Sequence, residues 1–73
     1  MDELKIGDRV EIHLDQKFGE LAGWYGGVVT RIEPYSEHRR FHWVRLDAEA
    51  QAALKVIEIS VFNPKHIRKA ARS

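Results

Sequence analysis

Strict alternation of apolar and polar residues is clearest at positions 9–14, where the sequence is RVEIHL. Successive side chains of an extended chain point to opposite faces, so Val10, Ile12 and Leu14 share one face. The charged and polar residues between them share the other face, which is typical of a strand that is buried on one side only. Such a strand needs neighbours that extend its apolar face, and the following chain contains segments that can provide them.

Four further segments have the composition of strands. The first of them should end at Pro34, because proline cannot donate the hydrogen bond that a ladder position requires. Within that segment, Val28, Thr30 and Ile32 are expected to share a face. The four predicted strands cover residues 27–33 (GVVTRIE), 41–47 (FHWVRLD), 54–62 (LKVIEISVF) and 66–70 (HIRKA).

Alternation in the later strands predicts which side chains point into a core. The residues between them are mostly charged, polar or aromatic, and these are expected on the outer side. The residues predicted to point inward are Val44, Leu46, Ile57, Ile59, Val61 and Ile67.

Two short segments have helical character. Residues 48–54 are rich in Ala, Glu and Gln, which favour helix, and Asp47 before them can cap a helix. Residues 64–66 (PKH) are expected to form a single helical turn before the last strand. Five short strands with tight turns predict an all-β fold. We expect the sheet to close into a small barrel, because closure removes its exposed edges.

Length and composition indicate one small globular domain. The chain has 73 residues, of which 44% are hydrophobic and 32% charged, and it has no cysteine. We expect a single domain over residues 1–73, with its core at about 5–69 and a basic, flexible tail at 70–73. Without an apolar signal segment at its acidic N-terminus, the chain is expected to be cytoplasmic.

The order of these motifs resembles a known group of small barrels. KIGDRVEI, a glycine-bearing loop and GGVVTRIE are similar to the opening of SH3-like barrels, and most similar to the KOW type of ribosomal and transcription-elongation proteins. The later VRLD and ISVFNPKHIRKA resemble the strand, one-turn helix and final strand that complete those barrels. The layout also resembles small accessory barrels of photosynthetic electron-transfer complexes. The residues that match the KOW-like opening are Gly7, Asp8, Val10, Ile12, Gly23, Gly27, Val28, Val29 and Ile32.

Charge is unevenly distributed along the chain. Residues 1–33 contain seven acidic and four basic side chains, whereas residues 34–73 contain four acidic and eight basic ones. A local excess of positive charge can mark an anionic partner, and the resemblance to KOW proteins implies RNA or DNA. The predicted nucleic-acid contacts are Arg39, Arg40, Lys65, Arg68 and Lys69.

Aromatic residues provide a second candidate surface. In SH3-like barrels the first long loop borders the usual ligand surface, so the resemblance implies an aromatic groove there. Trp24 and Tyr25 are neighbours in an extended segment and should point to opposite sides, and we expect Trp24 to be the more packed of the two. Trp43 is either an exposed anchor or is covered by the helical insertion. The predicted partner-binding residues are Phe18, Trp24, Tyr25, Phe41, Trp43 and Arg45.

Motifs for catalysis, cofactors or metal are not apparent. The chain has no nucleophile elbow, no phosphate-binding glycine loop and no His-Glu-x-x-His motif, and without cysteine a structural zinc site would need most of its four histidines together. We therefore expect a non-catalytic binding module without cofactor or metal. It would dock a protein partner or act as a small accessory subunit of a larger complex. The alternative is KOW-type binding of RNA or DNA through the basic C-terminal half.

Overall fold

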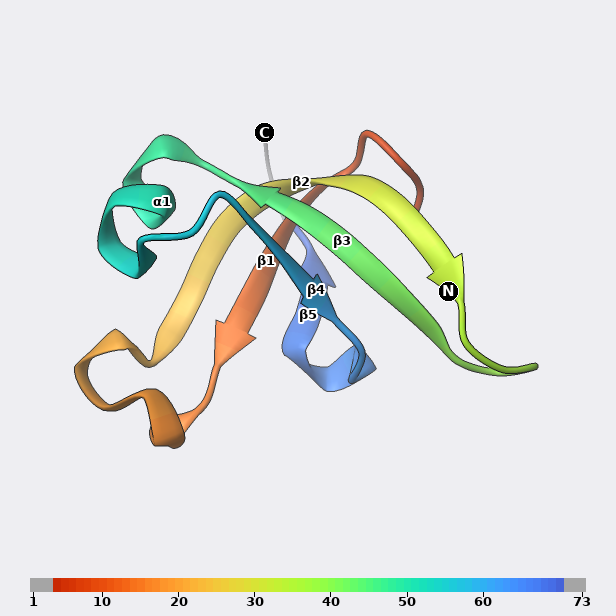
Figure 1. The fold of residues 1–73 in the computed structure, drawn as a ribbon, viewed down its shortest axis with the longest axis horizontal. Coiled ribbons are helices and arrows are strands. Elements are labelled where there is room, and N and C mark those ends of the chain that lie inside the picture. The colour runs from red at the N-terminus through yellow and green to blue at the C-terminus, as the bar shows by residue number, and fades with distance from the viewer. Residues whose placement is uncertain (1–3, 71–73) are drawn as a thin grey trace.

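The computed structural model describes residues 4–70, which form five antiparallel strands, one short α-helix and two 3-10 segments (Figure 1). This architecture confirms the all-β prediction with five strands. Of the tail expected at 70–73, residues 71–73 lie outside the described part of the chain. The elements in chain order are β1 (Arg9–Leu14), η1 (Gln16–Leu21), β2 (Gly23–Pro34), β3 (Arg40–Leu46), α1 (Ala48–Leu54), β4 (Glu58–Val61), η2 (Pro64–His66) and β5 (Ile67–Lys69).

The sheet has the strand order β4-β3-β2-β1-β5 and is not closed. Within residues 4–70, β4 pairs only with β3 and β5 pairs only with β1, so both are edge strands. The expectation of a closed barrel was therefore wrong. The chain passes from β4 to β5 through η2, where Pro64 cannot donate a ladder hydrogen bond and the backbone turns before the two edges can pair.

Strand β2 is the longest element and connects both sides of the sheet. Residues 23–28 pair with β1, and residues 27–34 pair with β3. The register shifts between Val29 and Arg31, which makes Thr30 the extra residue of a β-bulge. The Thr30 hydroxyl donates to a Glu58 carboxylate oxygen at 2.7 Å, so the bulge is tied to β4. Figure 1 shows β2 bending along its length.

The bulge changes which residues of β2 face the core. Val29 is buried, Val28 is half-buried and Thr30 is exposed, whereas Ile32 beyond the bulge packs against the core. The prediction that Val28, Thr30 and Ile32 share a face was wrong, because simple alternation does not allow for an inserted residue. Gly27 faces inward next to this point, and a Cβ there would lie 2.6 Å from the Arg45 carbonyl oxygen. The close approach of β3 therefore requires glycine.

The core is a single apolar cluster enclosed by the curved sheet. The predicted inward positions of β1, Val44, Leu46, Val61 and Ile67 are all buried, and Ile59 packs against them. Ile57 is 60% exposed, contrary to prediction, because β4 begins only at Glu58. The buried residues are Val10, Ile12, Leu14, Val29, Val44, Leu46, Ala50, Val61 and Ile67.

The helical pieces lie where the sequence predicts them. Helix α1 covers residues 48–54 and contributes Ala50 to the core, and η2 covers residues 64–66. Asp47 is the N-cap residue, but its carboxylate pairs with Arg9 instead of capping a backbone N–H. The strand predicted from residue 54 starts later, because α1 continues to Leu54 and ends at Lys55 in a left-handed conformation.

Segment η1 was not predicted. Asp15 caps it by accepting from the Lys17 backbone N–H at 3.1 Å, and this converts the glycine-bearing loop into an ordered turn. Among the helices of residues 4–70, none has both the length and the apolar composition that crossing a membrane requires.

Candidate functional site

An open groove of about 820 Å³ brings together basic residues that are distant in sequence. One wall comes from the turn between β2 and β3 and from the start of β3, and the other comes from β5. Four of the five predicted nucleic-acid contacts line this groove, whereas Lys65 lies outside it on η2. We call it the basic groove; its positively charged lining residues are Arg39, Arg40, Arg68 and Lys69.

The charge of the basic groove is only partly neutralised. Among the described residues that line it, Glu37 is the one acidic side chain. Lys69 is 3.9 Å from an Asp8 carboxylate oxygen, a long and exposed pair that contributes little. Within residues 4–70, no carboxylate lies at ion-pair distance from Arg39. The described lining therefore has four basic side chains against one acidic side chain, in a chain whose net charge is only +1.

The turn between β2 and β3 fixes the position of Arg39. Its carbonyl oxygen accepts from the backbone N–H groups of Tyr35 and Ser36, at 2.9 and 3.1 Å. The Arg39 guanidinium then lies over the Phe62 ring, 5.2 Å from the centroid, in a cation–π arrangement. An aromatic ring supports this cation without neutralising its charge.

Phe62 belongs to an aromatic trio at the edge of the basic groove. Tyr35 meets the rings of Phe41 and Phe62 edge-on, with centroids 5.6 and 5.1 Å apart, and the Phe41 and Phe62 rings are 4.9 Å apart. Phe41 and Phe62 are half-buried, whereas Tyr35 is 66% exposed. The trio therefore combines a packed base with one exposed ring, at the place where the basic side chains converge.

His42 also lines the basic groove, from the inward-facing side of β3. Burial lowers the pKa of its imidazole below the ordinary value of 6.5, and the positive charge of Arg40 lowers it further. His42 is therefore mainly neutral at neutral pH, where it adds a polar but uncharged group to the lining.

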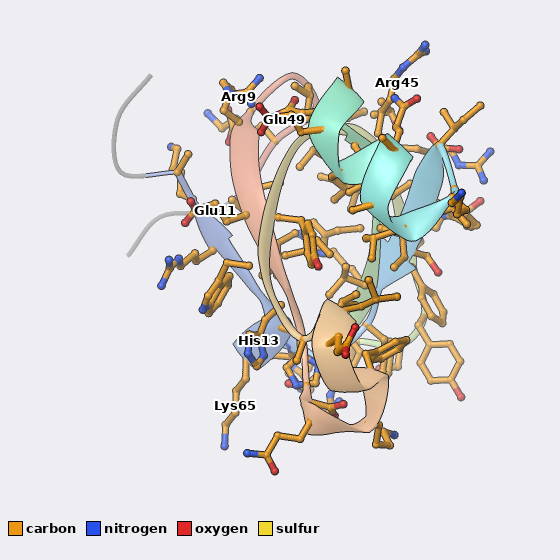
Figure 2. All side chains as sticks on the ribbon, turned by 90° about the vertical axis from the view of Figure 1, so that its left-hand side faces the viewer. Arg9, Glu11, His13, Arg45, Glu49 and Lys65 are labelled. Carbon is orange, nitrogen blue, oxygen red and sulfur yellow. The ribbon has the colours of Figure 1, made fainter. Side chains whose placement is uncertain are left out.

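The outer surface of β1, β2 and β5 has a second group of aromatic and charged side chains. The Arg68 guanidinium lies 3.7 Å from the Trp24 ring centroid, and its Nε donates to Glu11 at 2.7 Å. The His13 ring contacts the rings of Trp24 and His66, with centroids 4.8 and 5.7 Å apart. Figure 2 shows Glu11 and His13 projecting from β1 on the same side of the molecule as Lys65. We call Glu11, His13, Trp24 and Arg68 the outer-face cluster.

The predicted environments of Trp24 and Tyr25, one packed and the other exposed, are reversed in the structure. Tyr25 faces inward and packs against the core, and its hydroxyl donates to the Leu21 carbonyl oxygen at 2.6 Å. Trp24 points outward and is 40% exposed. The prediction was wrong because Tyr25 and Gly27 alternate onto the face of the buried Val29, and the sequence does not show which of the two faces is the inner one.

The six predicted partner-binding residues do not form one surface. Phe18 on η1 is 50% exposed and borders a smaller hollow next to β4. Trp43 is half-buried, lies under the Arg31 guanidinium and donates to Glu33 at 3.0 Å, so its contacts are with β2. Arg45 is exposed near α1, away from Lys65 (Figure 2). The aromatic groove expected at the first loop is therefore not assembled.

The sequence did not identify His42 and Phe62, which line the groove, or Tyr35, whose ring contacts Phe62 beside it. Each had a weak signal in the sequence. Tyr35 follows the strand-ending Pro34 inside a polar turn, His42 alternates with the inward Val44, and Phe62 directly precedes the Asn-Pro break. None of these signals indicates that the two segments meet, because only the tertiary fold brings residues 35–42 to residues 62–69.

Searches of family models, curated proteins and solved structures found no match to this chain. Within residues 4–70, no three or more His, Asp or Glu side chains are grouped so that they could hold a metal ion. The functional interpretation therefore depends on the groove and its chemistry.

Proposed function

We propose that this protein binds nucleic acid through the basic groove. The observation that supports this most directly is the convergence of Arg39, Arg40 and Lys69 from two distant segments on one open groove. Guanidinium and ammonium groups donate to phosphate oxygens, and an open groove can follow a phosphate backbone. The resemblance of the sequence motifs to the KOW type, which implies RNA or DNA binding, points in the same direction.

Salt dependence tests this proposal. We expect a fluorescently labelled oligonucleotide of about 12 nucleotides to bind in an anisotropy titration at about 50 mM salt. With three groove cations contacting phosphates, the slope of log affinity against log salt should be about −2 for a single strand. An absence of saturable binding at this salt concentration would rule the proposal out.

A pair of double variants controls for net charge. Arg39→Gln with Arg40→Gln removes two groove cations and should weaken binding by about tenfold for each lost contact at low salt. Arg45→Gln with Lys55→Gln removes the same charge from positions outside the groove and should change affinity less than twofold. Equal losses in the two proteins would show that overall charge, and not the groove, attracts the ligand.

A second candidate is docking to a protein partner as an accessory subunit, and the exposure of Phe18 and Leu21 on η1 favours it. This surface adjoins the smaller hollow, which is lined partly by Ile59 and Val61. A pull-down should then recover a defined partner with the wild-type protein and not with Phe18→Ser, Leu21→Ser. If both baits recover the same proteins, this surface is not the docking site.

A further inference from the structure

We infer that the basic groove selects single-stranded over double-stranded nucleic acid, because the exposed ring of Tyr35, which contacts Phe62 at the edge of the groove, can be used only by an unpaired base. This inference rests on the proposed function and specifies its ligand. The residues that support it are Tyr35, Arg39 and Phe62.

The aromatic trio has the construction of a stacking platform. The Tyr35 ring packs nearly perpendicular to the rings of Phe41 and Phe62, and the backbone of its turn is closed by the hydrogen bonds to Arg39. At 66% it is the most exposed large apolar side chain among the described residues. A ring that is held by two perpendicular neighbours and still mostly open to solvent can stack with a nucleobase at little entropic cost.

Basic groups are positioned to hold the strand that delivers such a base. The Arg39 guanidinium lies over Phe62, and Arg40 and Lys69 line the adjoining groove. A phosphate bound by these cations would place its neighbouring base at the aromatic trio. Aromatic stacking combined with backbone cations is the usual means of binding single strands without sequence specificity.

Charge alone would give the opposite preference. Duplex DNA has the denser phosphates. Each phosphate that a protein neutralises contributes about −0.9 to the slope of log affinity against log salt for duplex DNA, and about −0.7 for a single strand. A groove that acted only through its cations should therefore bind duplex at least as tightly. In a duplex the base faces are covered by their neighbours, so Tyr35 could add nothing there. The sign of the preference consequently separates stacking from simple charge attraction.

The test compares one labelled 12-nucleotide sequence as a single strand and as a duplex, with DNA and RNA versions of each, at the same low salt. We expect the wild-type protein to bind the single strand at least fivefold more tightly, the lower end of what one stacked base contributes. Equal or tighter duplex binding would overturn the inference while leaving nucleic-acid binding by the groove intact. Failure of both forms to bind would overturn the proposed function as well.

Three variants test whether the Tyr35 ring causes the preference for single strands. Tyr35→Leu keeps an apolar side chain without an aromatic face and should lose the single-strand preference, whereas Tyr35→Phe should retain it. Phe18→Leu removes an exposed aromatic ring outside the groove and should leave the preference unchanged. A preference that survives Tyr35→Leu in a protein with unchanged circular dichroism would overturn the inference.

Discussion

The two ends of β2 present aromatic residues of opposite character. Trp24 near its start is contacted by Arg68 and His13, and Arg68 is itself paired with Glu11. The ring of Tyr35, directly after the end of β2, contacts the rings of Phe41 and Phe62, and the neighbouring Arg39 lies over Phe62 without a carboxylate of residues 4–70 at ion-pair distance.

This difference shows that an exposed aromatic residue beside an arginine is not in itself a binding site. In the outer-face cluster, the carboxylate of Glu11 and the ring of Trp24 satisfy Arg68 internally, so the cluster holds β5 against β1. In the basic groove, the Phe62 ring positions the Arg39 guanidinium, and no carboxylate of residues 4–70 lies at ion-pair distance from it. We therefore expect substitutions in the first region to affect stability and substitutions in the second to affect binding.

The largest effect is expected at the bulge that separates the two halves of β2. Val29→Ala should lower the free energy of unfolding by about 2 kcal/mol, because Val29 is buried and its truncation leaves a cavity. Val28→Ala at the half-buried neighbour should cost about 0.5 kcal/mol. Urea unfolding measures both values, and a larger cost at Val28 would contradict the observed register of β2.

Substitution of Trp24, at the start of β2, is expected to affect stability and not binding. Trp24→Ala should lower the free energy of unfolding by about 1 kcal/mol, since it removes an exposed cation–π contact and part of the packing against His13. Its affinity for single-stranded oligonucleotide should change less than twofold. If Trp24→Ala weakens binding as strongly as the loss of Arg39 and Arg40, the outer-face cluster belongs to the ligand surface and the comparison fails.

A smaller effect is expected when Arg68 is released from its carboxylate. Glu11→Gln keeps the size of the side chain but removes the charge that holds Arg68, a residue that also lines the groove. The slope of log affinity against log salt for oligonucleotide binding should become more negative by up to about 0.7. The stability cost should stay below about 1 kcal/mol, as for other exposed pairs. Anisotropy titrations at several salt concentrations measure this slope. An unchanged slope would mean that Arg68 does not reach the ligand.

The smallest effect is expected from the titration of His42. Its pKa is lowered in the folded protein, so as the pH falls below about 6.5 the unfolded chain takes up a proton that the folded state resists. The His42 contribution to stability is therefore present above this pH and is lost as the pH falls through the lowered value. Urea unfolding at a series of pH values should show a weaker decline for His42→Gln than for the wild-type protein. Identical declines in both proteins would contradict the assignment.

Much of the fold could be predicted from the sequence, because it depends on local patterns. The alternation around Val10 and Ile12 and the Asn-Pro break are short-range signals. The five strands, α1 and η2 overlap the segments predicted for them, although β2 begins earlier, at Gly23, and β4 begins later, at Glu58. The bulge at Thr30 was not predictable by the same means, since an inserted residue leaves no mark in the composition. The open sheet edge likewise depends on how two distant strands meet.

The candidate site was predictable only in part. The basic residues were identified from the uneven charge along the chain, and four of them line one groove. Tyr35 was missed because its role depends on the rings of Phe41 and Phe62, which reach it only in the folded protein. Trp24 was assigned to the wrong environment because alternation does not show which face of a strand is the inner one.

The most direct test of this comparison is to map a bound single strand by NMR, which suits a chain of 8.5 kDa. A ¹⁵N-labelled sample would be titrated with an unlabelled oligonucleotide at about 50 mM salt, and the amide shifts followed residue by residue. We expect the largest shifts at Tyr35, Arg39, Arg40, Phe62 and Lys69, with Glu11, His13 and Trp24 nearly unchanged. Shifts concentrated on Glu11, His13 and Trp24, or no shifts at all, would contradict the assignment of the basic groove as the binding site.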